Sequence, residues 1–154
     1  MRVLQERIQF PSQLFACSKE TKTLKTNTAV FTTDMYSQIV LEIFELYNSL
    51  HTQAEFAACL VRLAGHDFMD FRRRADGTTT GGSDGCINFD DPDNSGLQEC
   101  LQATNIQSVY DNHCDVVSLA DFIIIASEAV MARTATKFDE SNAFVPGSLE
   151  DAFR

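Results

Sequence analysis

One pair of side chains in the sequence combines a permanent positive charge with a titratable imidazole. Arg62 and His66 are four residues apart, so a helix places them on one face, one turn from each other. His66 can accept a proton from one oxygen of hydrogen peroxide and return it to the other oxygen. Arg62 can stabilise the negative charge that develops on the departing oxygen. The pair could cleave peroxide, although residues at this spacing more often form a surface hydrogen-bond arrangement.

Three further motifs follow this pair in a fixed order. They are Gly81-Gly-Ser-Asp84-Gly-Cys86, Asn94-Ser-Gly-Leu97 and Val117-Ser-Leu-Ala-Asp121. Together with Arg62-x-x-x-His66-Asp67, they resemble the haem peroxidase superfamily that includes ascorbate, cytochrome c, lignin and horseradish peroxidases. The resemblance covers about residues 35–133. It implies haem b as the cofactor, with hydrogen peroxide and a small reducing compound as substrates.

The resemblance also implies roles for individual residues. Arg62 and His66 match the distal arginine and histidine of the family. Asn94 matches the asparagine whose side chain accepts a hydrogen bond from the distal imidazole. That bond would fix the tautomer, so that the other ring nitrogen faces the peroxide. Asn94 could instead serve as a helix N-cap, and the two functions are compatible.

A calcium site is a second implication of the resemblance. Asp67, Gly82 and Asp84 match positions that hold a calcium ion in the fungal and secreted plant branches. Carboxylate and carbonyl oxygens suit calcium, whereas Cys86 places a poorly suited thiol where a hydroxyl ligand is usual. The site is empty in the ascorbate peroxidase branch. The alternative is a turn that the two carboxylates hold by hydrogen bonds.

Two departures from the family pattern bear on activity. Gly65 stands where the family has an aromatic side chain over the haem. The family's iron-binding histidine lies beyond the position of Arg154, where this sequence ends, so no haem-binding residue is identifiable. His51 and His113 are expected to be ordinary surface histidines.

The sequence therefore predicts the distal, N-terminal half of a haem peroxidase, inactive as an isolated chain. The alternative is a non-catalytic relative that persists as an accessory or structural subunit of a larger assembly. In either case, another protein chain could cover the apolar surface that faces the haem in the family, because an exposed patch of this kind is a binding site or an aggregation liability.

The elements that must position these residues are expected to be helices. Apolar residues recur at three- and four-residue steps over 34–50 and predict an amphipathic helix. Capping boxes open two more predicted helices, over 52–69 and 118–133. A shorter helix is expected over 94–103 and a loop over 71–92. Because alternating β-branched residues are scarce, the fold class is predicted to be all-α, the distal-side helical half of the peroxidase fold.

Composition divides the chain and limits its partners. Residues 1–33 are expected to form a polar N-terminal arm, 34–133 the peroxidase-like domain, and 134–154 a C-terminal loop or tail. The formal net charge of -10 argues against nucleic acid as a partner, because phosphate binding requires a basic surface. No apolar run approaches the length that a membrane span needs.

The number and spacing of the cysteines indicate the redox state of the cellular compartment. The cysteines are Cys17, Cys59, Cys86, Cys100 and Cys114. Their odd number and the lack of a Cys-x-x-Cys motif argue against zinc and thioredoxin-like sites. The pattern favours a reducing compartment, so an intracellular or organellar location is expected over secretion. Phe68 and Ser83 occupy the positions of a disulfide in the secreted plant branch, which argues against that branch.

Overall fold

The computed structural model describes residues 31–138 of the chain. Its helices are α1 (Thr33–Ser49), α2 (Gln53–Met69), α3 (Leu97–Thr104), α4 (Ile106–His113) and α5 (Leu119–Phe138), with a 3-10 turn, η1 (Pro92–Asn94). Two short strands, β1 (Arg72–Arg73) and β2 (Thr79–Thr80), complete the described part. The fold is mostly helical, as predicted. The expected arm lies largely outside the described residues, and α5 continues through the first residues of the expected tail.

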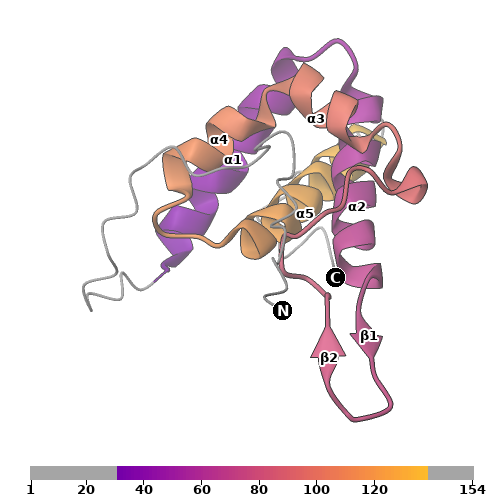
Figure 1. Cartoon of the computed structure of the whole chain (residues 1–154). Coiled ribbons are helices and arrows are strands. Elements are labelled where there is room, and N and C mark those ends of the chain that lie inside the picture. Colours follow the sequence, from indigo (N-terminus) through magenta and orange to yellow (C-terminus); the bar gives the residue numbers. More distant parts are fainter. Residues whose placement is uncertain (1–30, 139–154) are drawn as a thin grey trace.

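The helices pack around one apolar core with α5 at its centre. α5 lies against both α1 and α2, while α4 packs on α1 and α3 packs on α2 (Figure 1). A helix that is covered from two sides needs apolar residues around more than one face, which explains why four residues of the run Phe122-Ile-Ile-Ile-Ala126 are buried and only Ile124 is exposed. The largest buried apolar side chains are Ile39, Ile43, Phe56, Leu60, Leu63, Leu97, Leu101, Ile106, Phe122, Ile123 and Val130.

The N-termini of the helices test the predicted capping boxes. The Ser118 hydroxyl accepts a hydrogen bond from Asp121 N at 3.0 Å, so the cap predicted for α5 is confirmed. The box predicted at Thr52 and Glu55 is wrong, because the Thr52 side chain makes no capping hydrogen bond. Helix α2 forms regardless, since its stability comes mainly from burial of an apolar face and not from a single cap.

The segment predicted as a loop over 71–92 contains a β-hairpin. Arg72 pairs with Thr80 and Arg73 with Thr79 in antiparallel register. The Asp76 carboxylate closes the turn by accepting hydrogen bonds from Thr78 N at 2.9 Å and from Thr78 Oγ1 at 2.7 Å. The hairpin projects beyond the C-terminal end of α2, away from the helices (Figure 1). Two-residue strands are too short to show alternation in a sequence, so this element was not predicted.

The region after the hairpin also differs from expectation. The helix predicted over 94–103 begins at Leu97, and a further helix, α4, follows Asn105, whose φ of 57° turns the chain between them. His113 is not a surface histidine as predicted. It is buried at the end of α4, and its Nε2 lies 2.9 Å from Glu42 Oε1 on α1. A carboxylate from a helix distant in sequence cannot be read from local spacing.

Gly85 allows the loop after the hairpin to lie against the start of α5. Its φ is 76°, and a Cβ at this position would lie 2.9 Å from Leu119 Cγ. Both the backbone conformation and the close approach therefore favour glycine.

We predict that Gly85→Ala lowers the free energy of unfolding by about 1–3 kcal/mol, measured by urea denaturation. Gly77→Ala is the matched control, because Gly77 has a φ of 86° but open space around its Cβ position. In Gly77→Ala, the free energy of unfolding should fall only by the cost of the backbone strain at a positive φ. Equal losses in the two variants would show that the approach of Gly85 to Leu119 contributes nothing.

Candidate functional site

A chain of hydrogen bonds fixes the orientation of the His66 imidazole. His66 Nδ1 lies 2.6 Å from Asn94 Oδ1, and Asn94 Nδ2 donates to the backbone carbonyl of Asn88 at 2.8 Å. Because the Asn94 amide NH2 is directed at Asn88, its oxygen faces the imidazole and accepts from Nδ1–H. In the neutral ring, Nε2 is then left with a free lone pair. Nε2 makes no hydrogen bond with the described residues.

The expected contact between His66 and Asn94 is therefore confirmed. Asn94 is not the N-cap of the following helix, which is Gly96. Asn94 instead ends η1, and its side chain makes the contacts with His66 and Asn88.

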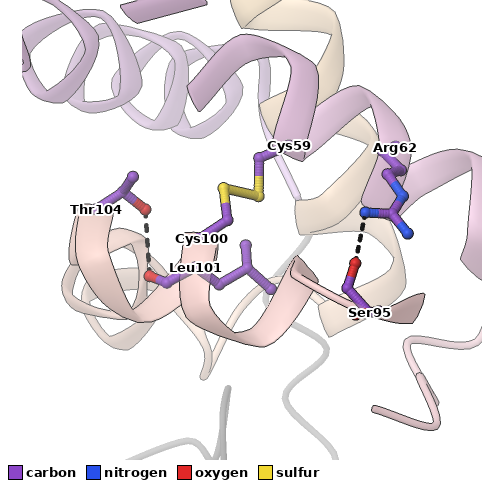
Figure 2. Close-up of a disulfide and its surroundings, with 6 residues drawn as sticks. All are labelled: Cys59, Arg62, Ser95, Cys100, Leu101 and Thr104. Carbon is purple, nitrogen blue, oxygen red and sulfur yellow. Dashed lines mark hydrogen bonds between the residues drawn. A yellow bond between two sulfur atoms is a disulfide. The ribbon is translucent and has the colours of Figure 1, made fainter. Parts of the chain in front are cut away.

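Arg62 contacts the same short segment from one turn earlier on α2. Its Nη1 donates to the carbonyl of Ser95 at 2.8 Å (Figure 2), and its Nη2 donates to the carbonyl of Asp93 at 2.6 Å. Arg62 and His66 thus lie on one face of α2, as predicted from their spacing. A guanidinium has five N–H donors, and these two bonds leave others available for an anion.

His66 and Asn94 border a pocket of about 440 Å³ beside the base of the hairpin. Asp70, Asp84 and Arg72 also line it, so the pocket offers charged groups and can admit a small hydrophilic molecule next to the imidazole. The free thiol of Cys86 lines it too. Burial and the nearby Asp84 carboxylate raise the pKa of this thiol, which disfavours the reactive thiolate.

The contacts of Asp67 match a hydrogen-bonded turn better than a calcium site. Its buried carboxylate accepts from Gly85 N at 2.9 Å through Oδ1 and from the Ser83 hydroxyl at 3.4 Å through Oδ2. Asp84 Oδ1 accepts from Cys86 N at 2.9 Å within its own turn. The carboxylates that would bind calcium are thus directed at donors of the loop.

The third residue expected at the calcium site, Gly82, is held through its amide N–H and not through the carbonyl that would bind calcium. Gly82 N donates to Asp70 Oδ1 at 2.5 Å, so this glycine ties the loop to the end of α2. Across residues 31–138, no group of three or more His, Cys, Asp or Glu side chains could hold a metal ion. The residues present therefore fit calcium poorly.

The face of α2 beside Arg62 and His66 is open and partly apolar. A Cβ added at Gly65 would meet nothing within 4 Å. Val61 is 39% exposed, and Met69, at the end of the helix, is 68% exposed. A flat apolar group could lie on this exposed surface of α2.

Neither of the other described histidines is placed to bind an iron near His66. His51 precedes the start of α2, about 20 Å from His66 at the rise of an α-helix. His113 Nε2 is engaged by Glu42. The described residues thus offer no further histidine that could bind an iron beside His66.

Sequence reasoning missed a disulfide that joins α2 to α3. Cys59 and Cys100 are bonded, with their Cα atoms 6.4 Å apart (Figure 2), and Cys114 is disulfide-bonded as well. The expectation of reduced cysteines is therefore wrong for these residues. Disulfides persist in oxidising environments, so the argument for a reducing compartment no longer holds. The 41-residue separation of the bonded pair gave no local signal.

Comparisons of the chain with protein-family models, curated proteins and solved structures found no match. Among the helices of the described residues, none is long and apolar enough to cross a membrane. The functional interpretation therefore rests on the motifs and on the geometry of His66, Arg62 and Asn94.

Asp67 provides a test of the loop through the pH dependence of stability. Burial raises the pKa of its carboxyl above the ordinary 3.8, and the Gly85 amide opposes this shift only in part. The folded state therefore binds the proton more tightly than the unfolded state. The resulting stabilisation is present below pH 3.8 and is lost as the pH rises through the folded-state pKa.

We predict that Asp67→Asn removes this pH dependence of the free energy of unfolding. The amide keeps an acceptor for Gly85 N and cannot ionise. The free energy of unfolding of the wild type relative to Asp67→Asn should fall as the pH rises above 3.8, measured by urea denaturation at several pH values. A relative stability that rises over the same range would mean that the hydrogen bonds outweigh burial and lower the pKa instead.

Proposed function

We propose that this chain supplies the distal, peroxide-handling side of a haem-dependent peroxidase. The observation that carries the proposal is the hydrogen-bond chain from Asn88 through Asn94 to His66, which leaves His66 Nε2 free to act as a base. Arg62 lies one turn away on the same face of α2 and contacts the same segment. The order of the four motifs supports the same interpretation.

The side chains present account for the movement of one proton. The free Nε2 of His66 accepts the proton of the near peroxide oxygen and then donates it to the far oxygen, which departs as water. Asn94 supports both states of the ring, because Nδ1–H is donated to Oδ1 in the neutral and in the protonated imidazole. The unused N–H groups of Arg62 can stabilise the charge on the departing oxygen.

A haem would lie on the open face of α2 that carries Arg62, Gly65 and His66. When bound, it would supply the redox chemistry of peroxide reduction, with electrons from a small reducing substrate. Its iron would require a proximal ligand from outside the described residues. The Cys59–Cys100 disulfide favours an oxidising compartment for such an enzyme.

A non-catalytic role is the alternative, and one observation favours it. Phe68, Met69 and Phe71 are 66%, 68% and 55% exposed around the end of α2, so this surface could pack against another protein chain of a larger assembly. The open position at Gly65 lacks the aromatic side chain that the resemblance leads one to expect. Peroxidase activity in the presence of added haem and a soluble proximal ligand distinguishes the proposed peroxidase half from such an accessory subunit.

We predict that the isolated chain binds haem weakly or not at all, because neither His51 nor His113 is placed to bind the iron. Haem titration followed by Soret absorbance measures this. Stoichiometric binding, with peroxidase activity lost in His66→Ala, would show that an unrecognised ligand completes the site.

The proposal itself is tested by adding imidazole as a soluble proximal ligand to the chain and haem. We expect peroxidase activity with a phenolic donor, reduced by about 100-fold or more in His66→Ala, since positioned acid–base catalysis contributes factors of that order. His51→Ala should retain the activity. Equal activity in the wild type and His66→Ala would contradict the proposed function.

A further inference from the structure

The Cys59–Cys100 disulfide lies in line with the polar contacts that shape the candidate site. Cys59 precedes Arg62 by three residues and His66 by seven, so the three side chains follow one side of α2. Their partners are Cys100 at one end and the segment 93–95 at the other. Figure 2 shows the disulfide and the Arg62 contact side by side, bridging the same two parts of the chain.

The segment 93–95 has little else to hold it against α2. Asp93 and Ser95 are exposed, and Asn94 is only half-buried. The helix that follows, α3, has eight residues, a length at which an isolated helix is marginal in water. Leu97 and Leu101 anchor α3 in the core, but neither lies within the segment that contacts His66.

We propose that the Cys59–Cys100 disulfide positions Asn94 against His66 and thereby keeps the imidazole in its Nδ1–H tautomer. The bond closes a loop between α2 and α3, which limits how far the segment 93–95 can move away from α2. Cys59 and Cys100 are thus positioning residues that act through Asn94. The predicted effect on the tautomer of His66 follows from the geometry alone. Only the consequence of this tautomer for peroxide cleavage rests on the proposed function.

The tautomer can be measured directly from the ¹⁵N chemical shifts of the imidazole nitrogens in alkaline buffer, with His66 assigned by comparison with His66→Ala. The wild type should show the Nδ1–H form. The double variant Cys59→Ala/Cys100→Ala should shift towards the Nε2–H form, as Asn94→Ala does. Cys114→Ala is the matched control, because it removes a disulfide-bonded cysteine outside the α2–α3 contact and should leave the tautomer unchanged.

An unchanged Nδ1–H form in the folded double variant would overturn the proposal. If the double variant does not fold, Leu101→Ala in the disulfide-bonded chain decides the question, because it loosens the core contact of α3 and leaves the disulfide in place. Retention of the Nδ1–H form in Leu101→Ala supports positioning by the disulfide. Its loss would show that core packing alone positions Asn94.

The imidazole-supplemented peroxidase assay separates this inference from the proposed function. A tautomer shift in the double variant should be accompanied by a loss of activity of up to about 100-fold, the order expected when a reacting group is misplaced. A tautomer shift without any change in activity would leave the positioning role intact and contradict only the catalytic role of His66.

Discussion

The hydrogen bond between His66 and Asn94 is the interaction on which the proposed chemistry of this molecule depends. It joins α2 to a segment 28 residues later in the chain and decides which imidazole nitrogen is free. Its direction is set by a third group, the carbonyl of Asn88, which occupies the Asn94 amide NH2. A backbone carbonyl that forms no hydrogen bond with the imidazole therefore determines which ring nitrogen of His66 is free.

The core keeps this interaction in place by fixing the two elements that carry it. Phe56, Leu60 and Leu63 bury one side of α2, where α5 packs. Leu97 and Leu101 bury α3 in the same core. The polar contacts of Arg62 and His66 lie on a more exposed side of α2. The site is thus built at the edge of a packed helical core and not within it, which leaves the imidazole accessible to a small molecule.

Sequence reasoning succeeded where the determining contacts are local or belong to a motif. The helical period predicted α1, capping-box signals predicted helices at α2 and α5, and the family resemblance implied the pairing of His66 with Asn94. It failed where partners are distant in sequence. The disulfide between Cys59 and Cys100 and the hydrogen bond between His113 and Glu42 each join two different helices. The capping box at Thr52 failed for another reason, since burial of the apolar face of α2 is sufficient without the cap.

The β-hairpin has a consequence for how the length of this chain can vary. Residues 71–80 are all exposed, and β1 and β2 pair only with each other. The two ends of the hairpin are held together at its base, because Asp70 accepts a hydrogen bond from Gly82 N. The Cys59–Cys100 disulfide joins residues on either side of the whole segment. Insertions or deletions at its tip would alter the sequence distance between His66 and Asn94 without moving either side chain, since long surface loops are tolerated at small entropic cost. Relatives of this molecule could therefore have a different number of residues between His66 and Asn94. The residues at the base of the hairpin, Asp70 and Gly82, would be a better guide in recognising such relatives than this number.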